Sequence, residues 1–281
     1  MTHPKLFFIL GCQRSGTTLM RYILESHSQI SCIDEYRGYS LLQTSELLNQ
    51  ELQKNSHKKY IGFKLPRITE QLLNSILTDV DIDFHAINNF KNTQLIFMVR
   101  NIFDVVSSMK TLIDQNNMWI KTWPEKWLTF WMEKNPTLMN EYELEIDYWK
   151  NSKQKDVVAA AIMWKIKTLS LQKYKKEQMN VLPVSYEDLV INKINTIHHV
   201  LDFLDLSWED SVLSHEKASH VEVDEHGIGI GNNDSTKPIF TKSVNKYSQI
   251  LTDDEISEIT KIVPENQKLI SDLIGTKNSE Q

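Results

Sequence analysis

The sequence predicts an α/β protein built on a doubly wound parallel sheet that is flanked by helices. Apolar runs recur along the chain, and they are continuous rather than alternating, as in strands that helices cover on both faces. Segments with a helical period of apolar residues lie between these runs. A glycine-containing loop joins the first run to the first helical segment, which is the usual ligand-binding position in such sheets.

Four buried strands are predicted from the apolar runs. They cover Lys5–Leu10, Ile61–Leu65, Gln94–Val99 and Val181–Tyr186. Because strands alternate with helices, we expect parallel pairing through crossover connections. Ligands of such sheets bind at the carboxyl ends of the strands, so the residues that follow each run are the first candidates for a site.

Helices are predicted between the strands. Thr17–His27 and Phe103–Ile113 both repeat apolar residues close to the helical period. Residues 115–180 are expected to be mostly helical and to form a cap on the acceptor side of the sheet, with Val157–Tyr174 as a long helix. Thr122-x-x-Glu125 predicts a capping box, with Pro124 tolerated in the first turn.

The C-terminal part is predicted to be helical as well. Thr252-x-x-Glu255 is a second capping box, and Pro264 is expected to open a last helix. The sequence contains no internal repeat, low-complexity tract or linker. One domain covering residues 1–281 is therefore expected.

Composition restricts the class of protein. The chain has 281 residues, of which 41% are hydrophobic and 24% charged, as in a globular protein with a full core. Its apolar runs are too short for a membrane span, and Met1–Leu10 is shorter than a secretion signal. Cys12 and Cys32 suggest no disulfide framework, so a cytoplasmic location is expected. A net charge of −6 argues against a broad nucleic-acid surface.

The first candidate site is the loop Gly11-Cys12-Gln13-Arg14-Ser15-Gly16-Thr17-Thr18. Its glycine spacing is that of a P-loop, but Thr17 stands where an ATP-binding loop has lysine. Arg14 is the nearest replacement for that charge. Backbone amides of Ser15–Thr18, at a helix N-terminus, are expected to point at an anion. The loop therefore predicts a phosphate-like ligand other than ATP.

The second candidate site follows the strand Gln94–Val99, which is continued by Arg100. In ATPases and kinases the matching strand tends to end in an acidic residue that helps to hold magnesium. An arginine is instead suited to a second phosphate, and Ser108 lies two helical turns further along the chain, within reach of the same anion. No metal site is expected.

Three segments together resemble the motifs of sulfotransferases, in the same order. Gly11–Thr18 is similar to their phosphosulfate loop, Val99–Ser108 to their 3′-phosphate motif, and Tyr186-Glu187-Asp188-Leu189 to a segment that follows a late strand. A weaker match continues from Lys237 to Tyr247. The donor implied by this resemblance is 3′-phosphoadenosine 5′-phosphosulfate (PAPS), with no metal.

The stretch from Arg14 to Arg37 resembles the tyrosylprotein-type branch of that family. The resemblance implies that Glu35 is the catalytic base, with Asp34 as a neighbour that could be mistaken for it. It also implies that Lys64 stabilises the transition state; in the phenol and steroid branch a histidine base stands there. Tyr186 would pack on the adenine and Lys246 would bind the donor.

The expected function is sulfuryl transfer from PAPS to a hydroxyl or amine of a small-molecule, sugar or peptide acceptor. Two alternatives stay open from the residues. A P-loop kinase for nucleotides or small molecules is disfavoured by Thr17 and Arg100. A nucleotide-binding protein without catalysis would bind the same donor but would not depend on Glu35.

Two further patterns have two interpretations each. Trp119, Trp123, Trp127 and Trp131 recur every four residues and predict a helix that packs on the core, or that lines an acceptor cleft. Gly227–Gly231 resembles a nucleotide-binding fingerprint but has no strand–turn–helix context. It is interpreted as a loop, and a lid over the donor is the alternative.

Overall fold

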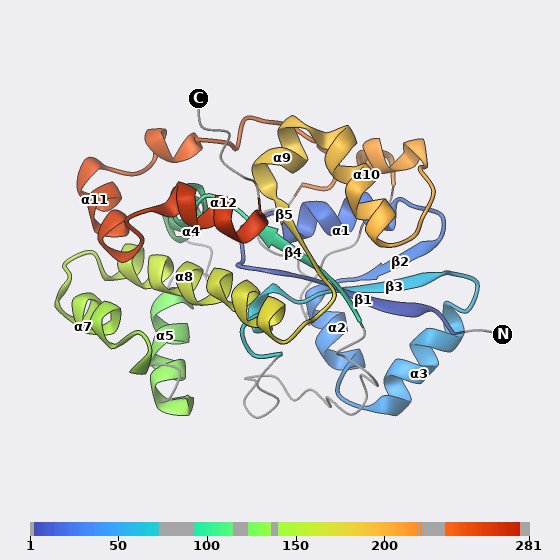
Figure 1. The fold of residues 1–281 in the computed structure, drawn as a ribbon, viewed down its shortest axis with the longest axis horizontal. Coiled ribbons are helices and arrows are strands. Elements are labelled where there is room, and N and C mark those ends of the chain that lie inside the picture. The colour runs from blue at the N-terminus through green and yellow to red at the C-terminus, as the bar shows by residue number, and fades with distance from the viewer. Residues whose placement is uncertain are drawn as a thin grey trace.

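The computed structural model describes residues 3–72, 93–114, 123–135, 140–218, 220 and 234–275. Its strands form one five-stranded sheet in the order β2-β3-β1-β4-β5, and every neighbouring pair is parallel. The strands are β1 (Lys5–Gly11), β2 (Ile30–Ile33), β3 (Tyr60–Lys64), β4 (Gln94–Val99) and β5 (Val181–Ser185). The predicted α/β fold with a parallel sheet is confirmed (Figure 1).

Helices connect and cover the strands. They are α1 (Thr17–Glu25), α2 (Glu35–Leu41), α3 (Ser45–Lys54), α4 (Ile102–Asp114), α5 (Trp123–Lys134), α7 (Glu143–Asn151), α8 (Lys155–Lys176), α9 (Tyr186–Ile191), α10 (Lys193–Phe203), α11 (Asp253–Ile262) and α12 (Asn266–Ile274). Short 3-10 turns are η1 (Pro66–Ile68), η3 (Asp210–Leu213), η4 (His215–Lys217) and η5 (Lys246–Gln249).

Several boundaries differ from the sequence prediction by one or two residues. The strand predicted to end at Tyr186 ends at Ser185, because the Ser185 side chain accepts a hydrogen bond from the amide of Asp188 and so begins α9 at once. The first helix ends at Glu25 rather than His27. The last helix begins at Asn266, two residues after Pro264.

One strand was not predicted. β2 is four residues long and includes Ser31, so it lacks the continuous apolar run that marks the other strands. It forms one edge of the sheet and pairs with β3 on one side. A short edge strand is specified by its pairing partner more than by its own composition.

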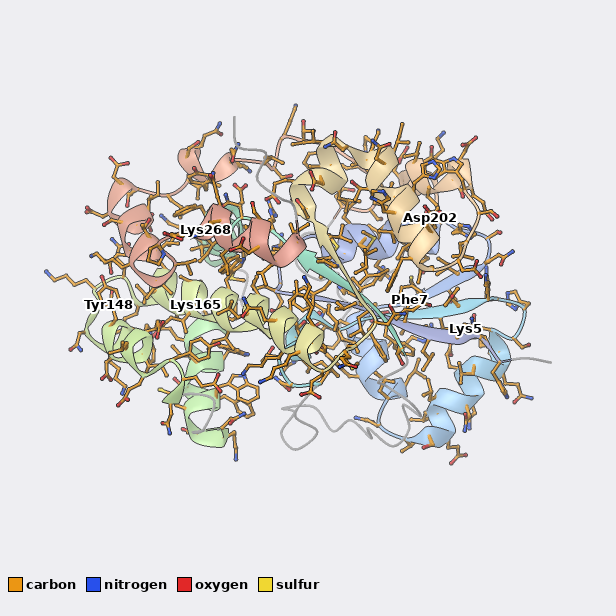
Figure 2. All side chains as sticks on the ribbon, in the orientation of Figure 1. Lys5, Phe7, Tyr148, Lys165, Asp202 and Lys268 are labelled. Carbon is orange, nitrogen blue, oxygen red and sulfur yellow. The ribbon has the colours of Figure 1, made fainter. Side chains whose placement is uncertain are left out.

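Both faces of the sheet are buried, as continuous apolar strands require. Phe8 and Leu10 point to a core shared with α2, α3 and α12, whereas Phe7 and Ile9 point to a core shared with α1, α9 and α10. Figure 1 shows α1, α9 and α10 above the sheet and α2 and α3 below it. Phe7, labelled in Figure 2, has its ring centroid 6.0 Å from that of Tyr60.

A third core joins α4, α5, α7, α8 and α11 beside the sheet. Trp127 and Trp131 are buried in it, 5% and 1% exposed, which favours the packing interpretation for these two rings. Trp119 lies outside the described residues, as do Thr122 of the first predicted capping box and Gly227–Gly231. The assignment of this helical layer to the acceptor side stays a prediction, as does a single domain over 1–281.

The second capping box is present at α11. The Thr252 side chain accepts from the amide of Glu255, and the Glu255 side chain accepts from the amide of Thr252. Within the described part of the chain, no helix combines the length and apolar character that crossing a membrane requires.

Candidate active site

The strand order places the two predicted anion-binding segments next to each other. β1 and β4 are neighbours at the centre of the sheet, and from β1 the chain continues to β2 and β3 on one side before it crosses to β4 on the other. This is the topological switch point, where parallel sheets of this type bind ligands. The loop Gly11–Thr18 leaves the end of β1, and Arg100 leaves the end of β4.

The glycines of the first loop are required by their surroundings. Gly16 has φ of 89°, and a Cβ added there would lie 2.4 Å from Cδ2 of Tyr186. Gly11 has φ of 129°, and its Cβ would lie 2.3 Å from the carbonyl oxygen of Met98. Arg14 also adopts a positive φ, of 68°. The backbone of the loop therefore requires glycine at positions 11 and 16, where φ is positive and a Cβ would collide with a neighbour.

Backbone amides at the start of α1 are directed toward the loop. Gly16 caps α1, and no side chain of the described residues caps this helix end. First-turn amides of Thr17 and Thr18 are therefore placed to receive an anion. The amide of Ser15 donates to the carbonyl of Cys12 at 3.1 Å, and its contact with a ligand stays a prediction.

Arg14, Ser108 and Arg100 are linked by hydrogen bonds near the carboxyl ends of β1 and β4. Nε of Arg14 donates to Oγ of Ser108, in the second turn of α4, at 3.0 Å. Nη1 of Arg100 donates to the backbone carbonyl of Arg14 at 2.8 Å. Arg14 therefore contacts Ser108 through its side chain and Arg100 through its backbone carbonyl.

Arg100 is 7% exposed and is held in place from several sides. Its backbone carbonyl accepts from Nε1 of Trp164 at 3.0 Å, and its guanidinium lies 4.1 Å from the centroid of the Tyr186 ring. Its Nε is buried and has no hydrogen-bond partner among the described residues. A buried donor without a partner is rare unless a ligand or water supplies one, so this atom fits an anionic group at the switch point.

The residues just before η5, from Ser243 to Asn245, contact Arg100 and its neighbours Tyr186 and Asp104. The carbonyl of Ser243 accepts from Nη2 of Arg100 at 2.7 Å, and its hydroxyl is 2.5 Å from the Tyr186 hydroxyl. The carboxylate of Asp104 accepts from the amides of Asn245 and Tyr247 at 2.8 and 3.1 Å. Lys246 lies between those two amides and is exposed at the start of η5.

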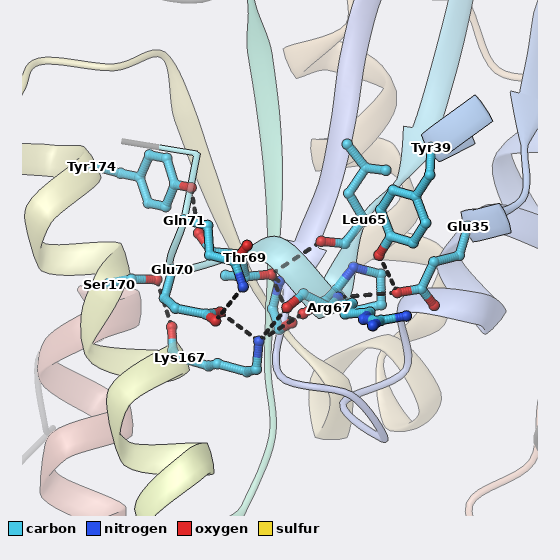
Figure 3. Close-up of polar contacts among 12 residues, drawn as sticks. Glu35, Tyr39, Leu65, Arg67, Thr69, Glu70, Gln71, Lys167, Ser170 and Tyr174 are labelled. Atoms are coloured by element: carbon cyan, nitrogen blue, oxygen red, sulfur yellow. Dashed lines mark hydrogen bonds and ion pairs between the residues drawn. The ribbon is translucent and has the colours of Figure 1, made fainter. Parts of the chain in front are cut away.

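Glu35 begins α2, directly after its N-cap residue Asp34. Its Oε1 accepts from the hydroxyl of Tyr39 at 2.6 Å and from the backbone amide of Arg67 at 3.0 Å (Figure 3). Asp34 instead accepts from the amide of Arg37 at the helix end. The two carboxylates therefore have different roles. Asp34 caps α2, and Glu35 is oriented by η1, the turn that follows β3.

Lys64 ends β3 and is buried, 3% exposed. Its Nζ donates to Oγ1 of Thr18 at 3.1 Å, so its positive charge lies at the first turn of α1, beside the phosphate loop. A buried ammonium is stable only where partners or anions compensate it. This placement agrees with the predicted contact between Lys64 and the transferred group, which stays a prediction.

Comparison with protein families decides the assignment. Residues 4–78 and 84–210 match the family described as the sulfotransferase family. The chain belongs to the sulfotransferase family. The matched residues include the phosphate loop, Arg100, Ser108 and Tyr186.

Curated relatives of this sulfotransferase-family chain are similar over most of its length. Protein-tyrosine sulfotransferase A of Caenorhabditis elegans is 22% identical over 265 residues, which are 93% of this chain and 66% of the relative. Protein-tyrosine sulfotransferase 2 of Gallus gallus is 22% identical, over 92% of this chain and 67% of the relative. The matched region spans 50% of the length of the Drosophila melanogaster protein-tyrosine sulfotransferase.

Solved structures share the fold. A sulfotransferase domain from the curacin biosynthetic pathway has a TM-score of 0.60 at 16% identity, covering 94% of this chain and 99% of that one. A mouse sulfotransferase complexed with PAP has a TM-score of 0.52 at 15% identity, covering 97% of this chain and 89% of that one. The family match and the shared fold confirm the predicted resemblance to sulfotransferases.

Several residues of the sulfotransferase-family site were missed by sequence reasoning. Oγ1 of Thr69 accepts from the amide of Gly11 at 3.0 Å and donates to its carbonyl at 2.9 Å. Oε1 of Glu187 accepts from the amide of Asn101 at 3.0 Å and so fixes the chain after Arg100. Glu187 stands in a predicted motif and could have been found from it. Ser243 lies in the weaker match from Lys237 to Tyr247, and Thr69 carries no such signal.

Proposed function

We propose that this protein transfers a sulfuryl group in line from PAPS to a hydroxyl or amine of a small-molecule, sugar or peptide acceptor, with Glu35 as the base. The observation that carries the proposal is the convergence of Arg14, Ser108 and Arg100 at the switch point, with a buried guanidinium nitrogen left for a ligand. A doubly anionic adenosine nucleotide fits two neighbouring arginines better than a nucleotide held by magnesium.

Each residue has a role that follows from its position. Arg14, the first amides of α1 and Lys64 surround the place where negative charge grows on the leaving oxygen, and they stabilise it there. Arg100 and Ser108 hold the 3′-phosphate, and Tyr186 covers the adenine. When bound, PAPS supplies the sulfuryl group and leaves as adenosine 3′,5′-bisphosphate.

Proton transfer is assigned to Glu35. As a bond forms between the acceptor oxygen and sulfur, the bond from sulfur to the phosphate oxygen breaks, and the acceptor proton passes to the Glu35 carboxylate. The hydrogen bonds from Tyr39 and from the Arg67 amide both go to Oε1, and they orient the carboxylate for this step.

The identity of the acceptor is narrowed by the relatives. Three of them carry the name protein-tyrosine sulfotransferase, so a tyrosine-containing peptide is the first acceptor to test. A simple phenol and a sugar are the next two. A cytoplasmic location is part of the proposal, since composition alone suggested it.

The donor class is tested by thermal shift. At a hundredfold excess over Kd, adenosine 3′,5′-bisphosphate stabilises the fold by about 2.7 kcal/mol, and the melting temperature rises by about 5 °C or more. ATP with magnesium is the control. Stabilisation by ATP alone would support the kinase alternative and contradict the proposal.

The base is tested by transfer of radiolabelled sulfate from PAPS to the three acceptors. Glu35→Gln should lower kcat by about a hundredfold or more, because general-base catalysis contributes that range. Asp34→Asn is the matched control. Asparagine also caps helices, and its side-chain oxygen can still accept the hydrogen bond from the amide of Arg37. Equal transfer rates in Glu35→Gln and the unchanged protein would indicate another base. Binding of the nucleotide with no transfer to any of the three acceptors would favour a binding protein.

A further inference from the structure

A buried ammonium group in α8 lies behind the turn that contacts Glu35. Lys167 has no exposed side-chain surface, and its Nζ donates to the carbonyl of Arg67 at 2.7 Å, to the carbonyl of Pro66 at 3.3 Å and to the carboxylate of Glu70. An ammonium group has three N–H donors, so these three acceptors satisfy it. All three belong to η1 or to the residues directly after it.

Arg67 is bonded on both sides of its backbone. Its carbonyl accepts from Lys167, and its amide donates to Oε1 of Glu35 at 3.0 Å. Figure 3 shows Lys167 on one side of the turn and Glu35 with Tyr39 on the other. Because η1 is one short turn, fixing its carbonyls from α8 also fixes the direction of the Arg67 amide.

The same turn is tied to the phosphate loop. Oγ1 of Thr69 bonds both the amide and the carbonyl of Gly11, and the hydroxyl of Tyr174 donates to the carbonyl of Thr69 at 2.5 Å. Lys167 and Tyr174 therefore anchor neighbouring parts of one turn to α8. One part contacts the base and the other contacts the donor loop.

We propose that Lys167 is a positioning residue that sets the orientation of the Glu35 carboxylate through the backbone of Arg67. It contacts neither donor nor acceptor. The proposal deepens the proposed function and rests on Glu35 as the base. A misplacement of about 1 Å at a reacting group costs about a hundredfold in rate, so the anchor matters for kcat.

The test compares Lys167→Met with Lys165→Met. Nζ of Lys165, labelled in Figure 2, donates to Oε1 of Glu145 at 2.5 Å and to the carbonyl of Ile262 at 3.1 Å. Both partners lie outside η1, so Lys165→Met controls for removing a charge from α8. Lys167→Met/Glu70→Gln is included because it leaves no buried carboxylate without its partner. Both Lys167 variants should lower kcat about tenfold to a hundredfold for sulfate transfer to whichever of the three acceptors the protein uses. The Kd of adenosine 3′,5′-bisphosphate should change by less than about twofold.

A spectroscopic readout needs no acceptor. In a ¹⁵N-labelled sample the Arg67 amide should lose its protection from hydrogen exchange and change its chemical shift in both Lys167 variants, and should keep both in Lys165→Met. An unchanged Arg67 amide in Lys167→Met would overturn the proposal, whatever happens to activity.

Kinetic coupling separates positioning from general damage. In a Glu35→Gln background, Lys167→Met should change the residual kcat by less than about twofold, because its effect acts through Glu35. An equal loss in both backgrounds would overturn the positioning role and leave Glu35 as the base. A Glu35→Gln variant with full activity would overturn the base assignment and this inference with it.

Discussion

At the scale of single residues, Arg14 has two separate tasks. Its backbone carbonyl holds Arg100, and its side chain bonds Ser108. A side-chain substitution therefore leaves the carbonyl contact in place. This separation allows the proposed catalytic role of the guanidinium to be measured without releasing Arg100.

Arg14→Ala should lower turnover of sulfate transfer by about a hundredfold or more, because a lost charge-assisted contact to the developing charge has about that effect. Arg14→Lys is the control, since it keeps a positive charge and loses the planar fork. We expect it to retain an intermediate rate. Turnover within about threefold of the unchanged protein for Arg14→Ala would contradict the assignment.

Gly16→Ala should destabilise the fold and weaken binding of adenosine 3′,5′-bisphosphate, since its Cβ would meet the Tyr186 ring. Gly275→Ala is a matched control: Gly275 has a similar φ of 82°, and a Cβ there has nothing within 4 Å. In urea denaturation, Gly275→Ala should lower the free energy of unfolding only by the backbone strain of about 1–2 kcal/mol. A similar loss in both variants, with nucleotide binding kept in Gly16→Ala, would show that the contact with Tyr186 is unimportant.

At the scale of elements, α11 is joined to α4 through its own N-terminus. Glu255 completes the capping box with Thr252, and its Oε1 also lies 2.7 Å from Nζ of Lys110 in α4. Burial alone would raise the pKa of Glu255. The hydrogen bonds from Lys110 and Thr252, with the charge of Lys110, outweigh burial and lower this pKa. The cap therefore contributes to packing between helices as well as to the helix end.

Thr252→Ala should lower the free energy of unfolding by about 1 kcal/mol, the usual effect of losing an N-cap side chain. Thr252→Ser keeps the hydroxyl and should stay close to the unchanged protein. The measurement is urea denaturation followed by circular dichroism. An alanine variant as stable as the serine variant would mean that water replaces the cap at no cost.

Sequence patterns predicted those elements that are long and uniform in polarity. β4 matches its predicted bounds because five apolar residues stand between Gln94 and Arg100, whereas β2 depends on pairing with β3. Likewise Arg14, Arg100 and Ser108 were predicted because each stands in a motif that begins at a strand end. Thr69 and Lys167 reach the site through contacts with residues far along the chain, and no local pattern encodes such contacts.

At the scale of the whole molecule, the pH dependence of stability includes a contact between α5 and α8. A hydrogen bond with Asp156, with burial and the charge of Asp156, raises the pKa of Glu125 from 4.5 to about 7. The folded state then binds a proton that the unfolded state releases between these values. The contribution of this pair to stability is therefore lost as the pH rises from about 4.5 to about 7.

Glu125→Gln should therefore raise the melting temperature more at pH 8 than at pH 5, because glutamine keeps a neutral partner for Asp156 at both pH values. Glu133→Gln on the same helix, at an exposed position, is the control and should show no such difference. Thermal melts at the two pH values provide the measurement. An equal shift at both pH values would contradict the coupling of Glu125 with Asp156.

Both cysteines are free and buried, and burial raises the pKa of the Cys12 thiol to about 12 and that of Cys32 further still. Alkylating reagents attack the thiolate, so the folded chain should resist maleimide at neutral pH. Cys12 lies inside the phosphate loop, and its rate of modification therefore measures how often that loop opens. Bound nucleotide should slow the modification of Cys12 and leave that of Cys32 governed by global unfolding.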